Sequence, residues 1–133
     1  MRNFKKYQVW KKSHAMVLSI YRDTRGFPQE ELYGLTSQIR RATISIAANI
    51  AEGAGKKTDA DFARFLYISM GSASEVEYHI LLAKDLGYVS DNRFCQLTND
   101  IEEIKKMLTG FIQKLTGENQ PWKANSTSQK TDR

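Results

Sequence analysis

Apolar side chains recur at every third or fourth position through four long segments of this chain, a spacing that indicates amphipathic helices. The clearest stripe lies in 90–117 and contains Phe94, Leu97, Ile101, Ile104, Leu108, Ile112 and Leu115. Similar spacing predicts helices over about 6–24, 29–52 and 58–87, and no segment has the alternation of a strand. Short connections make successive helices run in opposite directions. We therefore predict an all-α, up-down-up-down antiparallel four-helix bundle.

The other three stripes predict which face of each helix is buried. In the first helix the predicted core residues are Trp10, His14, Val17, Leu18 and Tyr21. In the second they are Leu35, Ile39, Ala42, Ile46 and Ile50, and in the third they are Phe62, Leu66, Ser69, Ala73, Val76 and Ile80.

Glycines and small polar residues predict the helix ends. Thr58 and Ser90 are placed to cap the third and fourth helices, and Gly87 and Gly117 to end them. The stretch GAGKKT at 53–58 resembles the end of a nucleotide-binding loop, but Ile50 stands where the motif needs its first glycine. A left-handed helix end at Gly53 or Gly55 is the better interpretation.

With 133 residues the chain is expected to form one domain, a bundle over 1–117 followed by a polar tail at 118–133 without a helical period. The single Cys95 allows no internal disulfide, and no spacing of a zinc site occurs. No apolar run approaches the roughly 20 residues that span a bilayer. We expect a cytoplasmic protein without a membrane segment, metal or cofactor.

The second and third helices carry a second apolar face, opposite the core, that a monomer would expose. This predicts a homo-oligomer packed through these helices. A strip of polar residues borders the face on each helix, and Arg41 of one strip could pair with Glu75 of the other, within or between subunits. The predicted interface comprises Arg41, Ile44, Ala48, Asn49, Glu52, Tyr67, Gly71, Glu75, Tyr78 and Leu82.

Positive charge is concentrated at the beginning of the chain. The net charge is +5, and residues 1–25 hold seven Lys or Arg against one Asp. In an antiparallel bundle the start of the first helix lies beside the end of the second, so both groups of lysines could form one rim for RNA or DNA phosphates. Tyr7 and Trp10 could stack on an unpaired base. The candidate binding residues are Lys5, Lys6, Lys11, Lys12, Arg40, Lys56 and Lys57.

Two other functional classes remain open. The sequence contains no nucleophile paired with a base, no paired carboxylates and no metal-ligand spacing, which are the patterns that would indicate a catalytic site. We therefore expect a non-enzymatic protein. A small enzyme would have to use Arg41, Glu75 and His79 at a subunit interface. Alternatively, the chain could be a protein-interaction scaffold that does not bind nucleic acid.

Three segments carry a resemblance to a known family: YQVWKKSHAM, ELYGLTSQIRRATISIAANIAEGAGK and FARFLYISMGSASEVEYHILLAKDLGYVS. Through about 4–115 the chain resembles the four-helix bundle proteins encoded by intervening sequences in bacterial 23S rRNA genes. Thr43 and Ala47 are modest departures from the family pattern. At these two positions the family also commonly has small residues or proline. The signature positions, which we interpret as fold and assembly positions, are Arg40, Arg41, Asn49, Glu52, Gly53, Gly71, Ser72 and Glu75.

The resemblance implies a ring-like pentamer and a link to nucleic acid. A related branch, the accessory variability proteins of diversity-generating retroelements, forms basic pentameric barrels that partner a reverse transcriptase. The family therefore implies, as partners, other copies of the chain, RNA or DNA, and a reverse transcriptase or another nucleoprotein.

Overall fold

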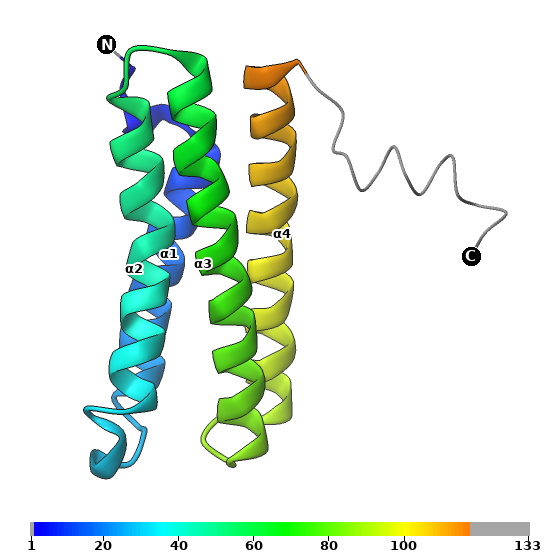
Figure 1. Ribbon diagram of the computed structural model, residues 1–133. Coiled ribbons are helices and arrows are strands. Elements are labelled where there is room, and N and C mark those ends of the chain that lie inside the picture. The colour runs from blue at the N-terminus through cyan, green and yellow to red at the C-terminus, as the bar shows by residue number, and fades with distance from the viewer. Residues whose placement is uncertain (1, 118–133) are drawn as a thin grey trace, which may run out of the picture.

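The computed structural model describes residues 2–117, and this part of the chain is helical without any strand (Figure 1). The predicted all-α fold is therefore confirmed, whereas the predicted polar tail at 118–133 lies outside the described residues. The four α-helices are α1 (Gln8–Thr24), α2 (Leu35–Ala54), α3 (Asp59–Asp85) and α4 (Asp91–Thr116). Two single 3-10 turns, η1 (Phe4–Lys6) and η2 (Gln29–Glu31), precede α1 and α2.

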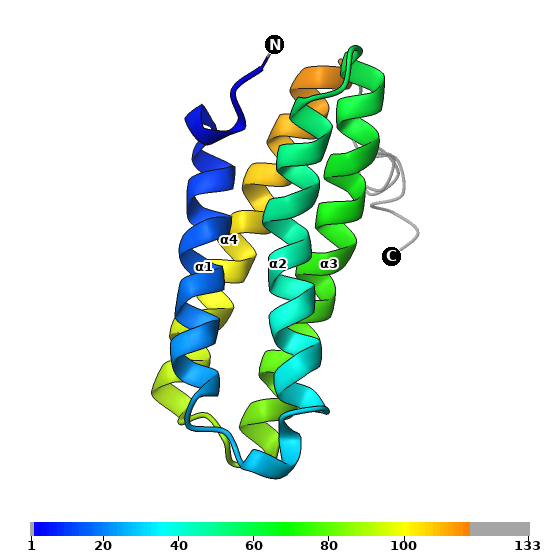
Figure 2. The ribbon, with the colours of Figure 1, turned by 90° about the vertical axis from the view of Figure 1, so that its left-hand side faces the viewer.

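Polar contacts at the two ends of the molecule show how the helices lie beside one another. At one end, Arg93 at the start of α4 pairs with Asp23 near the end of α1 at 2.8 Å. At the same end, the Tyr88 hydroxyl donates a hydrogen bond of 2.8 Å to Glu31 between α1 and α2. At the opposite end, the N-terminal segment meets the connection between α2 and α3, as Figures 1 and 2 show. The beginning of α1, the end of α2 and the end of α4 therefore share one end of the molecule.

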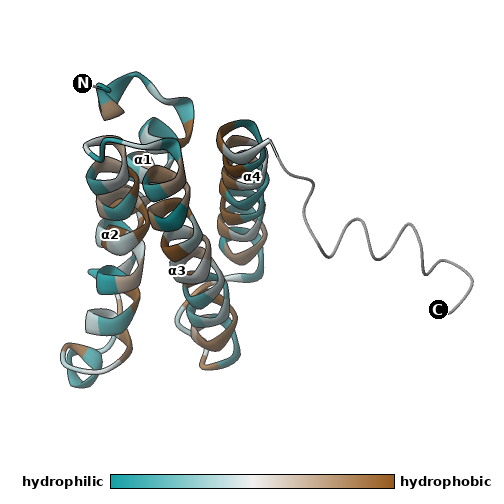
Figure 3. Ribbon diagram, turned by 45° about the horizontal axis from the view of Figure 1, so that its top comes forward, coloured by the Kyte–Doolittle hydropathy of each residue, from teal (hydrophilic) through white to brown (hydrophobic). Residues whose placement is uncertain are grey.

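The core stripes predicted for α2, α3 and α4 are confirmed. All the predicted residues of α2 and α3 are buried, and so are the five central residues of the α4 stripe, from Leu97 to Ile112. Phe94 and Leu115, at its two ends, are half-buried against the same cluster. Figure 3 shows the hydrophobic residues of α4 along the side that faces α3.

The buried face predicted for α1 is wrong for most of its residues, although Trp10 is half-buried against the core. His14 is exposed, and Leu18 and Tyr21 keep 47% and 36% of their surface accessible. The true stripe contains two hydroxyl residues that an apolar pattern does not detect: Val9, Ser13, Met16, Ile20 and Thr24. Each hydroxyl donates to a carbonyl one turn earlier in its own helix, Ser13 to Val9 and Thr24 to Ile20, both at 2.7 Å. Because these donors are satisfied within α1, they can be buried without an unpaired polar group.

Two predicted helix starts are also corrected. The first helix begins at Gln8, because Tyr7 adopts an extended backbone that separates α1 from the turn η1. The second begins at Leu35 rather than 29, because the backbone at Gly34 leaves the helical region with φ −114° and ψ −116°. The Glu31 carboxylate accepts a hydrogen bond of 3.1 Å from the Leu35 amide and thereby caps α2.

The end of α2 differs from its prediction as well. Gly53 lies inside the helix, and Gly55 is a right-handed C-cap with φ −80°, so neither adopts the left-handed conformation. Gly53 is required for a different reason, since a Cβ there would lie 2.8 Å from both Phe62 and Phe65. The left-handed ends predicted after α3 and α4 are confirmed at Gly87 (φ 81°) and Gly117 (φ 69°).

The predicted caps of α3 and α4 are confirmed. The Thr58 hydroxyl accepts a hydrogen bond from the Asp61 amide, and the Ser90 hydroxyl accepts one from the Arg93 amide, each at 3.1 Å. Within 2–117, none of the helices has the length and apolar content that crossing a membrane requires.

Candidate nucleic-acid interface

Arg2 joins the N-terminal segment to the connection between α2 and α3. Its guanidinium donates a hydrogen bond of 2.6 Å to the Lys56 carbonyl and pairs with the Asp59 carboxylate. It also lies 5.0 Å from the centre of the Phe62 ring, which is fully buried. These contacts bring together positive side chains that are about fifty positions apart in the chain.

We use the name basic end for the positive side chains gathered here: Arg2, Lys5, Lys6, Lys56 and Lys57. Lys5, Lys6 and Lys57 are exposed and form no ion pair within 2–117. Two acidic residues nearby have cationic partners, since Asp59 pairs with Arg2 and Asp61 lies 4.0 Å from Arg64, whereas the exposed Glu52, one turn before Lys56, has no ion-pair partner within 2–117. Arg2, Gly55, Lys56 and Lys57 line an open cavity of about 540 Å³. Cations therefore outnumber the acidic residues around this concave surface, and Lys5, Lys6 and Lys57 have no acidic partner within 2–117.

The structure places three other candidate binding residues outside the basic end. Lys12 points toward α4 and lies 3.6 Å from Asp100 and 3.4 Å from Glu103, so its charge is already neutralised. Arg40 lies near the opposite end of the molecule, where its Nε donates to the Thr24 hydroxyl at 2.8 Å and its guanidinium covers the Tyr21 ring. Lys11 is exposed in the first part of α1.

The two aromatic candidates for base stacking occupy different environments. Trp10 stacks on His14 with ring centres 5.0 Å apart and an interplanar angle of 5°, and the edge of Phe4 contacts it. Tyr7 instead lies between α1 and α4, with its ring centre 4.8 Å from that of Phe111. Both Trp10 and Tyr7 are half-buried against the core.

The second apolar surface predicted on α2 and α3 is exposed in the chain. We use the name apolar face for its accessible members: Ile44, Ala48, Tyr67, Gly71 and Tyr78. Tyr67 and Tyr78 keep 50% and 59% of their surface accessible, and Ile44 keeps 42%. Leu82, also predicted here, is half-buried and packs on the small cluster of Phe27, Leu35 and Ala83. Large apolar side chains that gather in this way are typical of protein interfaces.

Polar residues between α2 and α3 connect the two helices differently from the prediction. Within 2–117, no hydrogen bond or ion pair joins Arg41 to Glu75, which lies beside His79 instead, and the exposed Glu52 has no side-chain partner. The cross-helix contact is a hydrogen bond of 2.8 Å between the Ser45 and Ser72 hydroxyls. The Asn49 amide donates to Ser45 and so extends this network along α2.

His79 of α3 is buried, and it is the only residue of 2–117 with a buried side-chain polar atom, Nδ1, that lacks a hydrogen-bond partner. Its Nε2 lies 3.7 Å from the Glu75 carboxylate, one turn earlier on α3. Burial lowers the pKa of His79, although the Glu75 charge opposes the shift. The folded chain therefore favours a neutral His79.

The residues proposed for a small enzyme do not converge within one chain. Glu75 and His79 are neighbours, but Arg41 is exposed and pairs with neither of them. In the described part of the chain, no three His, Cys, Asp or Glu side chains are grouped as a metal site would require.

Sequence patterns missed Arg2, the residue that holds the basic end together. Its partners Lys56 and Asp59 are 54 and 57 positions away, and helical spacing reports only on neighbours within a few turns. The concentration of basic residues in 1–25 was the one available signal.

Comparisons with known proteins place the chain among helical relatives. The model of the family described as 23S rRNA-intervening sequence protein matches residues 5–110. One similar solved structure is a protein of unknown function from the S23 ribosomal protein family of Bacteroides thetaiotaomicron. It is 30% identical, with a TM-score of 0.73, and the match covers 79% of this chain and 95% of that chain. A search of curated proteins gives no match.

Proposed function

Because the chain belongs to the family of 23S rRNA-intervening sequence proteins, we propose that it is a non-enzymatic, homo-oligomeric bundle of antiparallel helices that binds structured RNA or DNA through its basic end. The observation that carries this proposal is the Arg2 contact with the Lys56 carbonyl. This contact brings the basic residues of the N-terminal segment close to those of the α2–α3 connection. Three of these residues, Lys5, Lys6 and Lys57, have no acidic partner in 2–117.

The chemistry of the basic end suits phosphates rather than base edges. Lysine ammonium groups on exposed, flexible stems act as point charges, so they contact a phosphate backbone without selecting a sequence. In an oligomer the basic end would be repeated once per subunit, and several weak contacts would act together on one nucleic acid. A ring-like pentamer, as the family resemblance implies, would arrange these copies around one axis. A reverse transcriptase or another nucleoprotein as partner, and a cytoplasmic location, remain predictions.

Nucleic-acid binding through the basic end should depend steeply on salt. With about four phosphate contacts, affinity for a labelled RNA hairpin should fall roughly 100-fold between about 50 and 200 mM salt. Fluorescence anisotropy measures this. The double variant Lys6→Glu/Lys57→Glu should bind at least about tenfold more weakly at low salt. The slope of its log affinity against log salt concentration should correspond to about two fewer phosphate contacts.

A matched control carries the same change of charge at the opposite end of the molecule. Arg22 and Arg25 are both exposed there, and the Arg22→Glu/Arg25→Glu variant should keep most of the affinity. Equal losses in the two double variants would show that only net charge matters and would contradict a localised site. No binding at low salt would instead favour a protein-interaction scaffold.

Assembly through the apolar face is a separate expectation. Light scattering at micromolar concentration should give a mass that is a multiple of the 15.2 kDa chain. The Tyr67→Glu/Tyr78→Glu variant should shift this mass toward the monomer, because burying two carboxylates in an apolar interface is costly. Tyr33, which is 92% exposed outside the apolar face, provides the control Tyr33→Glu. A monomeric unmodified chain would refute assembly.

A further inference from the structure

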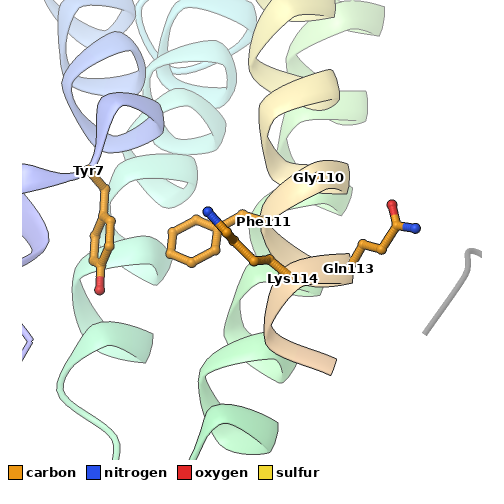
Figure 4. A pocket seen from close by; sticks show the side chains of 5 residues that line it. All are labelled: Tyr7, Gly110, Phe111, Gln113 and Lys114. Carbon is orange, nitrogen blue, oxygen red and sulfur yellow. The ribbon is translucent and has the colours of Figure 1, made fainter. Parts of the chain in front are cut away.

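An open pocket lies between the beginning of α1 and the end of α4, at the same end of the molecule as the basic end. It has a volume of about 650 Å³ and is lined by Tyr7, Gly110, Phe111, Gln113 and Lys114 (Figure 4). The figure shows the Tyr7 and Phe111 rings next to each other and the Lys114 ammonium beside Phe111, whereas Gln113 points away from Tyr7. Pockets that bind small ligands commonly have volumes in this range, about 300–1,000 Å³.

The local sequence explains why the pocket is open. Gly110 lies within α4 and contributes no side chain, and a Cβ built there would meet nothing within 4 Å. The extended backbone at Tyr7 brings its ring to the start of α1, where it lies against Phe111. A glycine inside a helix lowers the stability of the helix by about 1 kcal/mol relative to alanine. The open space beside Gly110 is therefore accompanied by a loss of helix stability.

The rings of Tyr7 and Phe111, which line the pocket, also pack against the buried ring of Phe62, over which Arg2 of the basic end lies. Phe62 and Phe111 pack edge to face with centres 5.1 Å apart, and the Arg2 guanidinium lies 5.0 Å from the centre of the Phe62 ring. A ligand in the pocket would therefore have aromatic carbon beside it, the Lys114 ammonium at the rim and further cations across the end of the molecule. A flat aromatic ring attached to a phosphate chain matches this combination.

We propose that this pocket takes one unpaired nucleobase of the RNA that the basic end binds, a specificity that rests on the proposed function. The base packs beside the rings of Tyr7 and Phe111, and a neighbouring phosphate lies near Lys114. The protein then prefers structured RNA with a bulged or looped-out nucleotide over a continuous duplex of the same length and charge.

The test compares two RNA hairpins that differ by one bulged 2-aminopurine, titrated into the full-length protein at about 100 mM salt. The bulged hairpin should bind roughly tenfold more tightly than the fully paired one, because this is the gain in affinity expected when one base stacks on an aromatic side chain. The 2-aminopurine fluorescence should change on binding, because the base moves from water to an aromatic environment.

The decisive variant is Gly110→Leu, which places a bulky side chain in the part of the pocket beside Gly110, where a Cβ meets no neighbour within 4 Å. It should keep or raise the melting temperature, because leucine favours a helix more than glycine does, while the preference for the bulge disappears. Gly110→Ala adds only one methyl group and should retain the preference.

The outcomes separate the two proposals. If both hairpins bind equally well to the unmodified protein, or if Gly110→Leu keeps the preference, the pocket inference is overturned and the basic end stands. If neither hairpin binds even at about 50 mM salt, the proposed function fails and the pocket inference fails with it.

Discussion

Replacing Phe62 by alanine should lower the free energy of unfolding by about 3–5 kcal/mol, the usual cost of truncating a fully buried aromatic ring. The ring has no accessible surface and packs against the rings of Tyr7 and Phe111 at 5.8 and 5.1 Å. The Arg2 guanidinium covers it as well. Its removal would leave a cavity at the point where the N-terminal segment, α3 and α4 meet. Urea denaturation followed by far-UV circular dichroism measures the effect.

Tyr33→Ala is the control for Phe62→Ala, because Tyr33 is 92% exposed and should change stability by no more than about 0.5 kcal/mol. A loss below about 1 kcal/mol in Phe62→Ala would contradict the packing of this aromatic cluster. The variant should also weaken RNA binding, since Arg2 loses the surface on which it rests.

Replacing Gly53 by valine should destabilise the fold by about 3 kcal/mol, for the opposite reason of too much volume. A Cβ at this position would lie 2.8 Å from Phe62 and from Phe65, and 3.2 Å from the Phe62 carbonyl oxygen. These atoms cannot easily move aside, because the Phe62 ring is fully buried and the Phe65 contact is made by its Cβ, which is fixed to the backbone of α3. Thermal and urea unfolding should both reveal the loss.

Gly110→Val serves as the matched control, since Gly110 lies within a helix but faces open space. It should be neutral or slightly stabilising, because valine has a better helix propensity than glycine. If the two valine variants were equally stable, close packing of α2 on α3 at Gly53 would be ruled out.

These two variants concern the same place, where α2 ends and α3 begins. Gly53 lets Phe62 and Phe65 approach α2, and Phe62 in turn supports Arg2 and the rings that border the pocket. The geometry of both proposed binding features therefore depends on the packing of this corner. A variant that loosens the corner should weaken the phosphate contacts and the base pocket together, whereas Gly110→Leu should affect only the pocket.

Much of the fold was predictable because it depends on local interactions. The apolar spacing of α2, α3 and α4 and the caps at Thr58 and Ser90 involve residues within a turn or two of each other, and all are confirmed. The family resemblance, carried by three motifs, is confirmed over 5–110. The buried face of α1 was not predictable by the same rule, because Ser13 and Thr24 are polar in sequence but satisfied within their helix.

The candidate site was predictable only as a concentration of charge. The sequence indicated that lysines of the first segment and of the α2–α3 connection share one end, but it also included Lys12 and Arg40, which have partners elsewhere in the fold. Which cation remains unpaired depends on the acidic side chains that a neighbouring helix brings near it. That information is not present in the spacing along one helix.

The helical class, most helix ends, the core faces of three helices and the family follow from the amino-acid sequence alone, because each depends on local spacing or on a motif that can be recognised in the linear chain. The role of Arg2 at the basic end, the need for Gly53 beside Phe62 and Phe65, and the pocket beside Gly110 become visible in the folded chain. Each of these depends on distances between segments far apart in sequence, which are set by how the helices pack.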